Sequence, residues 1–210
     1  MKNKIVYGLL AAGCILPIAL AGAWKQADKA GAESTYKKVG TVLENELKES
    51  DNRIVAEGKN IAVSQKEVNI RCELSKYSKN VLSEEDAVQE LIEEKALFEE
   101  AVKNGFQISD AELDKEMAEL KEVVETSENA DVIQELINAF EDEDAYWEYV
   151  RERNLIKGTI MAYWQSLKEQ YCEKDRVTQE TEVDEKEWET YMEQVTEKAV
   201  DKQEVELNMK

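Results

Sequence analysis

The chain has 210 residues, of which 42% are hydrophobic, and this is enough for a short targeting segment and one domain with a buried core. Its 27 Lys and Arg against 47 Asp and Glu give a formal net charge of −20 at pH 7, which repels nucleic acid and anionic lipid headgroups and excludes nucleic-acid binding. The chain has no histidine, so the usual general base and the commonest zinc ligand are missing. It also has no Gly-rich phosphate loop of the kind that binds nucleotides. We therefore expect no enzyme.

The first predicted element is a targeting segment over residues 1–24. Lys2 and Lys4 precede an uncharged stretch over residues 5–24, which is long enough to cross a bilayer as a helix. Ala21-Gly22-Ala23 has the small-residue pattern of a signal-peptide cleavage site. The segment is therefore either a cleaved signal peptide or a membrane anchor. Both alternatives predict an extracytoplasmic location for the remaining chain, either membrane-anchored or secreted.

The cysteines allow two covalent modifications in such a location. Cys14 follows Ala11-Ala12-Gly13, and together they weakly resemble a bacterial lipoprotein box. Cys14 is therefore either a lipidation site or an ordinary apolar residue of the segment. Cys72 and Cys172 are the remaining cysteines, and in an oxidising compartment they either form a disulfide or stay unpaired, with Cys72 buried on a helix.

Residues 25–50 are polar and show no core pattern, which predicts a tether with some helix between the apolar segment and the domain. The domain is then expected over residues 51–210. It begins with two short apolar stretches on either side of Gly58, within residues 53–63. This pattern predicts a small β-hairpin.

Helix starts are predicted at capping boxes, in which a serine oxygen accepts a free backbone N–H and an acidic side chain three residues later bonds back. Such boxes begin at Ser64, Ser83 and Ser109, and a weaker start occurs at Asp184. These starts divide the domain after the hairpin into several helices.

Apolar residues recur at helical spacing after the second and third caps, at Ala87, Leu91, Phe98 and Val102, then at Leu113, Met117, Leu120 and Val124. Gly105 fits the end of the first of these helices. A shorter helix is predicted around Ile133–Phe140 and a long one over residues 144–172. The predicted fold class is therefore mainly α, with several helices, one small β-hairpin and a preceding apolar segment.

The long helix carries most of the aromatic residues. Residues of a helix advance about 100° each, so one side of it carries a largely apolar stripe that we predict to be part of the core. The stripe consists of Tyr149, Ile156, Ile160, Tyr163, Leu167 and Tyr171. Trp147 lies about 140° from Ile160 on the same helix. Either the helix is buried on two sides, or Trp147 faces outward, where it would contact apolar polypeptide.

Three sequence runs resemble, in order and spacing, the SurA/PrsA-type N-terminal chaperone domain. The run from Val55 to Glu67 is similar to its strand-turn-strand opening, although Glu57 stands where the family often has asparagine. The run from Leu91 to Gly105 is similar to its next helix, and the run from Ile108 to Asp114 to the capped start that follows.

The resemblance covers residues 54–124 closely and 125–172 loosely. In this family a parvulin-type prolyl isomerase module of roughly a hundred residues usually follows a helix that resembles Val183–Lys198. The histidines of such modules have no counterpart in this chain. The resemblance therefore implies a SurA N-like binding domain without isomerase activity, which holds extended apolar stretches of exported proteins. It assigns no client-contact residue, because the matching motifs belong to the scaffold.

We expect an extracytoplasmic, ATP-independent chaperone or foldase-like protein that binds unfolded or exported polypeptides and needs no metal or cofactor. The alternative is a membrane-tethered, non-catalytic adaptor or structural domain that binds one specific partner. A broad apolar groove fits many clients, whereas one compact aromatic site fits a single partner. The aromatic residues that we predict to contact clients are Trp147, Trp164, Tyr146 and Phe106.

Overall fold

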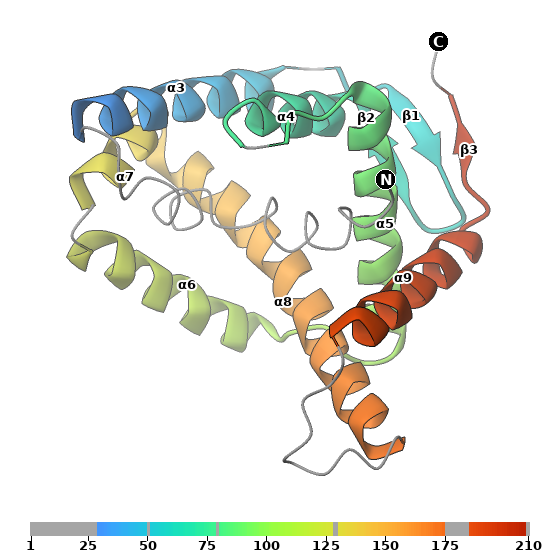
Figure 1. Cartoon of the computed structure of the whole chain (residues 1–210). Helices are drawn as coiled ribbons and strands as arrows, with labels where there is room; N and C mark the ends of the chain where they lie inside the picture. Colours follow the sequence, from blue (N-terminus) through green and yellow to red (C-terminus); the bar gives the residue numbers. More distant parts are fainter. Residues whose placement is uncertain (1–28, 50, 79, 128–129, 175–184, 209–210) are drawn as a thin grey trace.

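The computed structural model describes residues 29–49, 51–78, 80–127, 130–174 and 185–208, and within these ranges the chain forms seven helices and three short strands. The helices are α3 (Lys29–Lys48), α4 (Gln65–Ser75), α5 (Glu84–Lys103), α6 (Asp110–Thr126), α7 (Ala130–Ile137), α8 (Glu143–Lys174) and α9 (Glu185–Asp201). The strands are β1 (Ile54–Glu57), β2 (Ala62–Ser64) and β3 (Glu206–Leu207) (Figure 1). The prediction of a mainly α fold with a small hairpin is confirmed.

The three strands form one antiparallel sheet in the order β2-β1-β3. In the predicted hairpin Ala56 pairs with Val63, and the Gly58 amide donates to the Ile61 carbonyl across the turn at 2.8 Å. β3 was not predicted, and it adds to the other edge of β1, where Leu207 pairs with Ala56. The sheet thus joins the beginning of the predicted domain to the last described residues of the chain.

All three predicted capping boxes are present. The oxygens of Ser64, Ser83 and Ser109 accept from the backbone N–H three residues later, at 3.3, 3.1 and 3.3 Å respectively. The acidic side chain at that position accepts in return from the serine N–H. Gly105 ends α5 with φ +84°, a conformation that suits glycine, so the predicted helix end is also confirmed. Asp184 lies outside the described residues.

The predicted polar tether is wrong for residues 29–48, because they form α3 and contribute to the core. Ala32, Tyr36, Val39 and Leu43 repeat at spacings of four and three residues, and all four side chains are buried. They pack mainly on α7, where Gly40 lies against the backbone of Leu136. Only these four residues form the buried stripe, and the rest of the helix is rich in Lys, Glu and Gly. The apolar pattern is therefore weak in the sequence.

Two hydrophobic clusters make up the core, and α8 contributes to both. The first cluster joins α3, α6 and α7 with the beginning of α8, through Tyr146, Trp147 and Val150. The second joins the hairpin, α4, α5 and α9 with the middle of α8, through Ile160 and Trp164. In Figure 1, α8 runs as a long diagonal from α7 toward α9, which matches its part in both clusters. A helix that crosses two cores must be apolar on more than one side.

The C-terminal part packs back on the domain. α9 lies against α5, with Met192 and Ala199 buried in the second cluster. After α9, the Gln203 carbonyl accepts from the Lys59 N–H at 2.8 Å, and its side-chain oxygen accepts from the Asn60 N–H at 3.0 Å. These bonds position the chain for β3, so residues 185–207 complete the fold rather than extend from it.

Candidate functional site

Tyr146 and Trp147, two of the four predicted client-contact residues, are buried in the first cluster, with 3% and 9% of their surface exposed. The Trp147 indole N–H donates to Glu143 at 2.8 Å, and the Lys121 ammonium lies 4.8 Å from its ring centroid. An outward-facing Trp147 is therefore wrong, and the other interpretation, a helix buried on two sides, is confirmed.

The other two predicted residues, Trp164 and Phe106, belong to one continuous group of six aromatic rings, which we name the α8–α9 aromatic cluster. Its members come from the loop after α5, from α8 and from α9, and are Phe106, Tyr163, Trp164, Tyr171, Trp188 and Tyr191. Neighbouring ring centroids are 5.2–6.3 Å apart, within the range of favourable aromatic pairs. Residues from three segments of the sequence thus form a single surface.

The cluster has a buried side and an exposed side. Tyr163 and Trp164 are at most 7% exposed, and burial raises the pKa of the Tyr163 hydroxyl. Tyr171, Trp188, Tyr191 and Phe106 are only partly buried. The partly exposed rings pack on the buried ones through the Phe106–Tyr163 and Trp164–Trp188 contacts.

Trp188 and Tyr191 were not predicted as contact residues. They lie three positions apart on α9, so their rings lie on one face of the helix, with centroids 5.6 Å apart. Tyr171 comes from the last turns of α8 and lies 5.7 Å from Trp188 and 5.2 Å from Tyr191. The i, i+3 aromatic pair of α9 was a usable signal in the sequence. Its contact with α8 depends on tertiary packing.

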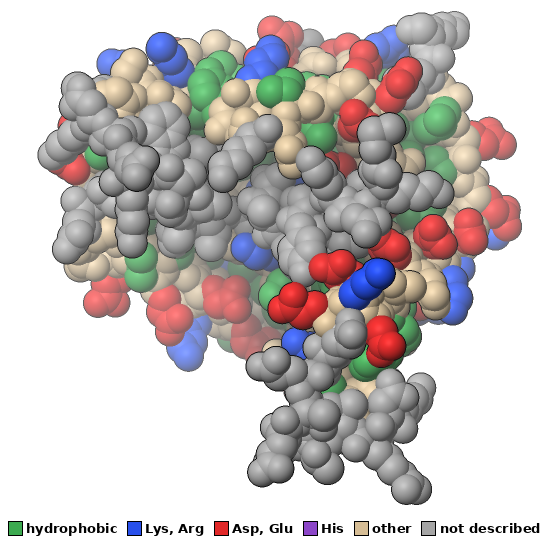
Figure 2. All heavy atoms as spheres, in the orientation of Figure 1, with side chains coloured by type: hydrophobic (Ala, Val, Ile, Leu, Met, Phe, Trp, Pro, Cys, Tyr) green, Lys and Arg blue, Asp and Glu red, His purple; other side chains and the backbone are tan. Residues whose placement is uncertain are grey.

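Charges surround this cluster unevenly. Within Glu185–Asp201, six acidic residues accompany two lysines, which gives α9 a net charge of −4. The ammonium of Lys168 lies 6.0 Å from the centroid of the Trp188 ring. Figure 2 shows acidic side chains beside hydrophobic atoms around α9. The cluster is therefore an apolar surface in an acidic environment.

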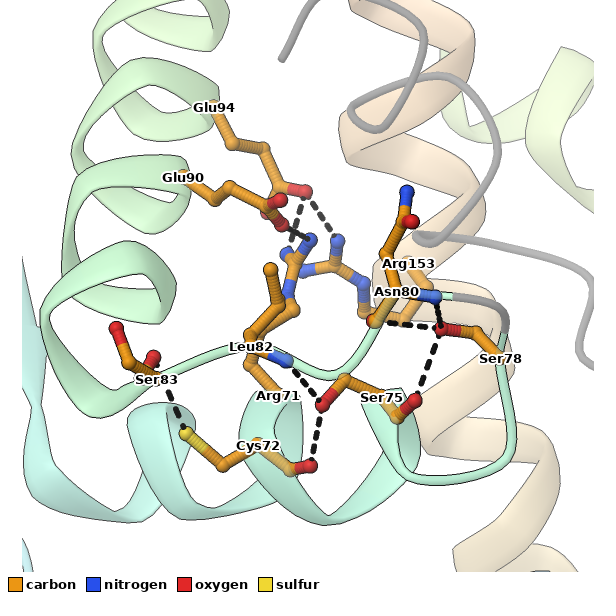
Figure 3. A network of polar contacts seen from close by, with 10 residues as sticks. All are labelled: Arg71, Cys72, Ser75, Ser78, Asn80, Leu82, Ser83, Glu90, Glu94 and Arg153. Carbon is orange, nitrogen blue, oxygen red and sulfur yellow. Dashed lines mark hydrogen bonds and ion pairs between the residues drawn. The ribbon is translucent and has the colours of Figure 1, made fainter. Parts of the chain in front are cut away.

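A second group of polar side chains is a buried ionic network between α4, α5 and α8 (Figure 3). One oxygen of Glu94 accepts from Arg71 at 2.8 Å and from Arg153 at 2.6 Å. Glu90 lies 3.4 Å from Arg71 and reinforces the pair. The other oxygen of Glu94 is buried and has no hydrogen-bond partner among the described residues. Glu94 therefore joins three helices through one carboxylate oxygen.

The two arginines set the charge state of this network. Burial alone would raise the pKa of Glu94, but Arg71 and Arg153 outweigh it and lower the pKa from 4.5 to about 2. Burial raises the pKa of Glu90 and Glu93, because fewer cations lie near these carboxylates to offset the cost of desolvation. Figure 3 also shows that the loop before α5 is fixed next to the network, because the Ser75 hydroxyl accepts from the Leu82 N–H at 2.9 Å. The arrangement is that of a structural connection between helices.

The predicted disulfide is not formed in this structure, so that alternative is wrong here. Cys72 and Cys172 are both free and partly buried. The Cys72 thiol lies 3.7 Å from the Ser83 carbonyl, to which it donates, and burial raises its pKa. A raised pKa keeps Cys72 as a thiol and lowers its reactivity.

The predictions for Cys14 and for residues 5–24 fall outside the described residues. Within the described ranges, no helix combines the length and the hydropathy that crossing a bilayer requires. The same ranges hold no group of three or more His, Cys, Asp and Glu side chains placed to bind a metal ion.

Comparison of the chain with models of protein families finds no match, and comparisons with curated proteins and with solved structures find none either. The resemblance to the SurA/PrsA-type domain therefore stays a prediction from the sequence.

Proposed function

We propose that this chain is an extracytoplasmic, ATP-independent chaperone-like protein that binds unfolded or extended apolar polypeptide and has no prolyl isomerase activity. The observation that carries the proposal is the α8–α9 aromatic cluster, in which partly exposed rings are fixed on buried ones. Aromatic side chains contribute most of the binding energy in protein interfaces, because they bury a large area at a small entropic cost. The SurA N-like order of hairpin and capped helices supports the same function.

The acidic surface fits this function physically. A net charge of −20 keeps a protein with exposed rings in solution, because like-charged copies repel one another. By covering apolar segments, the protein would lower the concentration of aggregation-prone chains without consuming ATP.

The compactness of the cluster favours a second candidate, a membrane-tethered adaptor for one specific partner. The large hydrophobic residues that are well exposed in the described part of the chain come from several different elements, namely Ile54, Val81, Val123, Met161 and Leu207. A compact aromatic group of this kind suits a single partner better than many clients.

A light-scattering assay tests the proposed site. The full chain is mixed at several molar ratios with three unrelated clients that aggregate on heating, and we expect it to delay their aggregation. The double variant Trp188→Ala/Tyr191→Ala is expected to lose most of this delay, because it removes two of the partly exposed rings. The control Val81→Ala/Val123→Ala, which removes exposed apolar groups away from the cluster, is expected to retain it.

Folding must be separated from binding in this test, because α9 packs on α5. Thermal unfolding is therefore recorded for every variant, and Tyr171→Asp provides a second change that leaves α9 intact. A wild-type chain that delays no client contradicts the chaperone function. Full activity in both cluster variants shows that the cluster is not the site, and activity toward only one client of the three favours the adaptor.

A further inference from the structure

If the proposed function holds, the rings and charges of the α8–α9 aromatic cluster indicate which class of polypeptide it binds. Rings of tryptophan and tyrosine carry a negative π-face, which attracts a Lys or Arg cation that lies above it. The cluster presents Trp188, Tyr171 and Tyr191 in mutual contact. A segment bound there would therefore meet three aromatic rings at once.

The chain itself already uses this kind of contact. The ammonium of Lys168 lies 6.0 Å from the Trp188 ring centroid, near the outer limit at which a cation and a ring attract one another. Lys168 is exposed, so its side chain can be displaced by another cation without breaking the core. The Trp188 ring is thus placed to take a cation from a ligand.

The charges of α9 act in the same direction. Glu185, Glu189 and Glu193 lie on the helix that carries Trp188 and Tyr191, and α9 has a net charge of −4. Carboxylates on the helix that carries these rings attract basic groups and repel acidic ones. Because the whole chain is also strongly acidic, this preference extends to the encounter between protein and ligand.

We propose that the α8–α9 aromatic cluster binds basic apolar polypeptide segments, in which Lys or Arg side chains alternate with apolar ones. The apolar side chains contact the rings, and the cations lie over ring faces or pair with the glutamates of α9. Acidic segments of the same hydrophobicity are excluded by repulsion. The preference is a property of this site and not only of the total charge.

Fluorescence anisotropy with three labelled peptides tests the charge preference on the full chain. The peptides share length and apolar residues and differ only in their polar positions, which are all Lys, all Ser or all Glu. We expect the Lys peptide to bind about tenfold tighter than the Ser peptide at low salt, and the Glu peptide to bind weakest. Raising the salt from about 50 to about 500 mM should shrink the difference, because screening shortens the range of the charges.

Two matched triple variants separate the site from the total charge. Glu185→Gln/Glu189→Gln/Glu193→Gln neutralises three carboxylates of α9, and we expect it to remove most of the preference for the Lys peptide. Its control, Glu116→Gln/Glu122→Gln/Glu125→Gln, changes the net charge equally on α6 and should keep the preference. Lys168→Gln should tighten binding of the Lys peptide, because it frees the ring of Trp188 from a competing cation.

Equal affinities for the three peptides would overturn this inference and leave polypeptide binding intact. Equal effects of the two triple variants would assign the preference to total charge and overturn it as well. No binding of any peptide would contradict the proposed function itself.

Discussion

Replacing Glu94 with glutamine is expected to lower the free energy of unfolding by about 3–5 kcal/mol. The substitution keeps the size of the side chain and removes only its charge. Arg71 and Arg153 would then lie in the interior without their shared counter-ion, which they approach to 2.8 and 2.6 Å in the native protein. Buried charges that lose their strongest partner are destabilising, because their desolvation is less well compensated. Urea unfolding followed by circular dichroism measures the change.

A matched control lies one residue away on α5. Glu93 is also buried, but its partner is the amide of Gln89 at 2.7 Å, and burial raises its pKa. Glu93→Gln removes a buried charge that has no ion pair among the described residues, so we expect an unchanged or slightly higher stability. If both variants lost the same stability, the effect would belong to α5 in general, and the ionic network would not explain it.

The same network predicts how stability depends on pH. The pKa of Glu94 is about 2 in the folded protein, below the ordinary value of 4.5, so the unfolded chain binds more protons between these values. The contribution of Glu94 is therefore fully present above about pH 5 and is lost as the pH falls toward 2. The Glu94→Gln variant should lose less stability than the wild type over this window. Parallel curves for the two proteins in urea unfolding at pH 5, 4 and 3 would contradict this.

This network also relates the fold to the proposed site. Arg153 and Trp164 are on the same helix, so the contact of Arg153 with Glu94 helps to fix α8 relative to α5. α9 in turn lies against α5 and carries Trp188 and Tyr191. The positions of the rings on α8 and α9 thus depend on α5 as a common support. A loss of the network would therefore reach the aromatic cluster through packing, without a direct contact.

Local signals in the sequence predicted the elements that depend on neighbouring residues. The serines at 64, 83 and 109 satisfy backbone groups within their own helix start, so their capping boxes are determined within four residues. The hairpin around Gly58 is equally local. β3 is not, because its two residues form a strand only through pairing with β1, far away in the sequence.

The candidate site was predicted only in part, because it also depends on tertiary packing. The sequence shows one apolar stripe on α8, but α8 crosses two cores. Trp147, which lies off that stripe, is therefore buried in the first cluster with α3, α6 and α7. Trp164 and Phe106 were predicted and belong to the cluster, yet Trp164 is its buried side. Trp188 and Tyr191 become part of a site only when α9 returns to α8. A single sequence contains no signal for that return.

Replacing Gly40 with alanine is expected to destabilise the protein by about 1–3 kcal/mol, although alanine is the better helix former. A Cβ atom at this position of α3 would lie 2.3 Å from the Leu136 carbonyl oxygen and 2.8 Å from the Cβ of Ala139. The nearer atom belongs to the backbone of α7, so the overlap is relieved only if the two helices move apart. Such a movement opens the first cluster around Leu136 and Val39, which are both fully buried.

Gly31 in the same helix provides the control for this prediction, since nothing lies within 4 Å of a Cβ atom placed there. Gly31→Ala should be neutral or stabilise the protein by up to about 1 kcal/mol, through the higher helix propensity of alanine. The opposite signs of the two changes separate packing from propensity, and urea unfolding of both variants measures them. If Gly40→Ala were as stable as Gly31→Ala, then α3 would not pack closely on α7, and residues 29–48 would be the tether that their composition suggests.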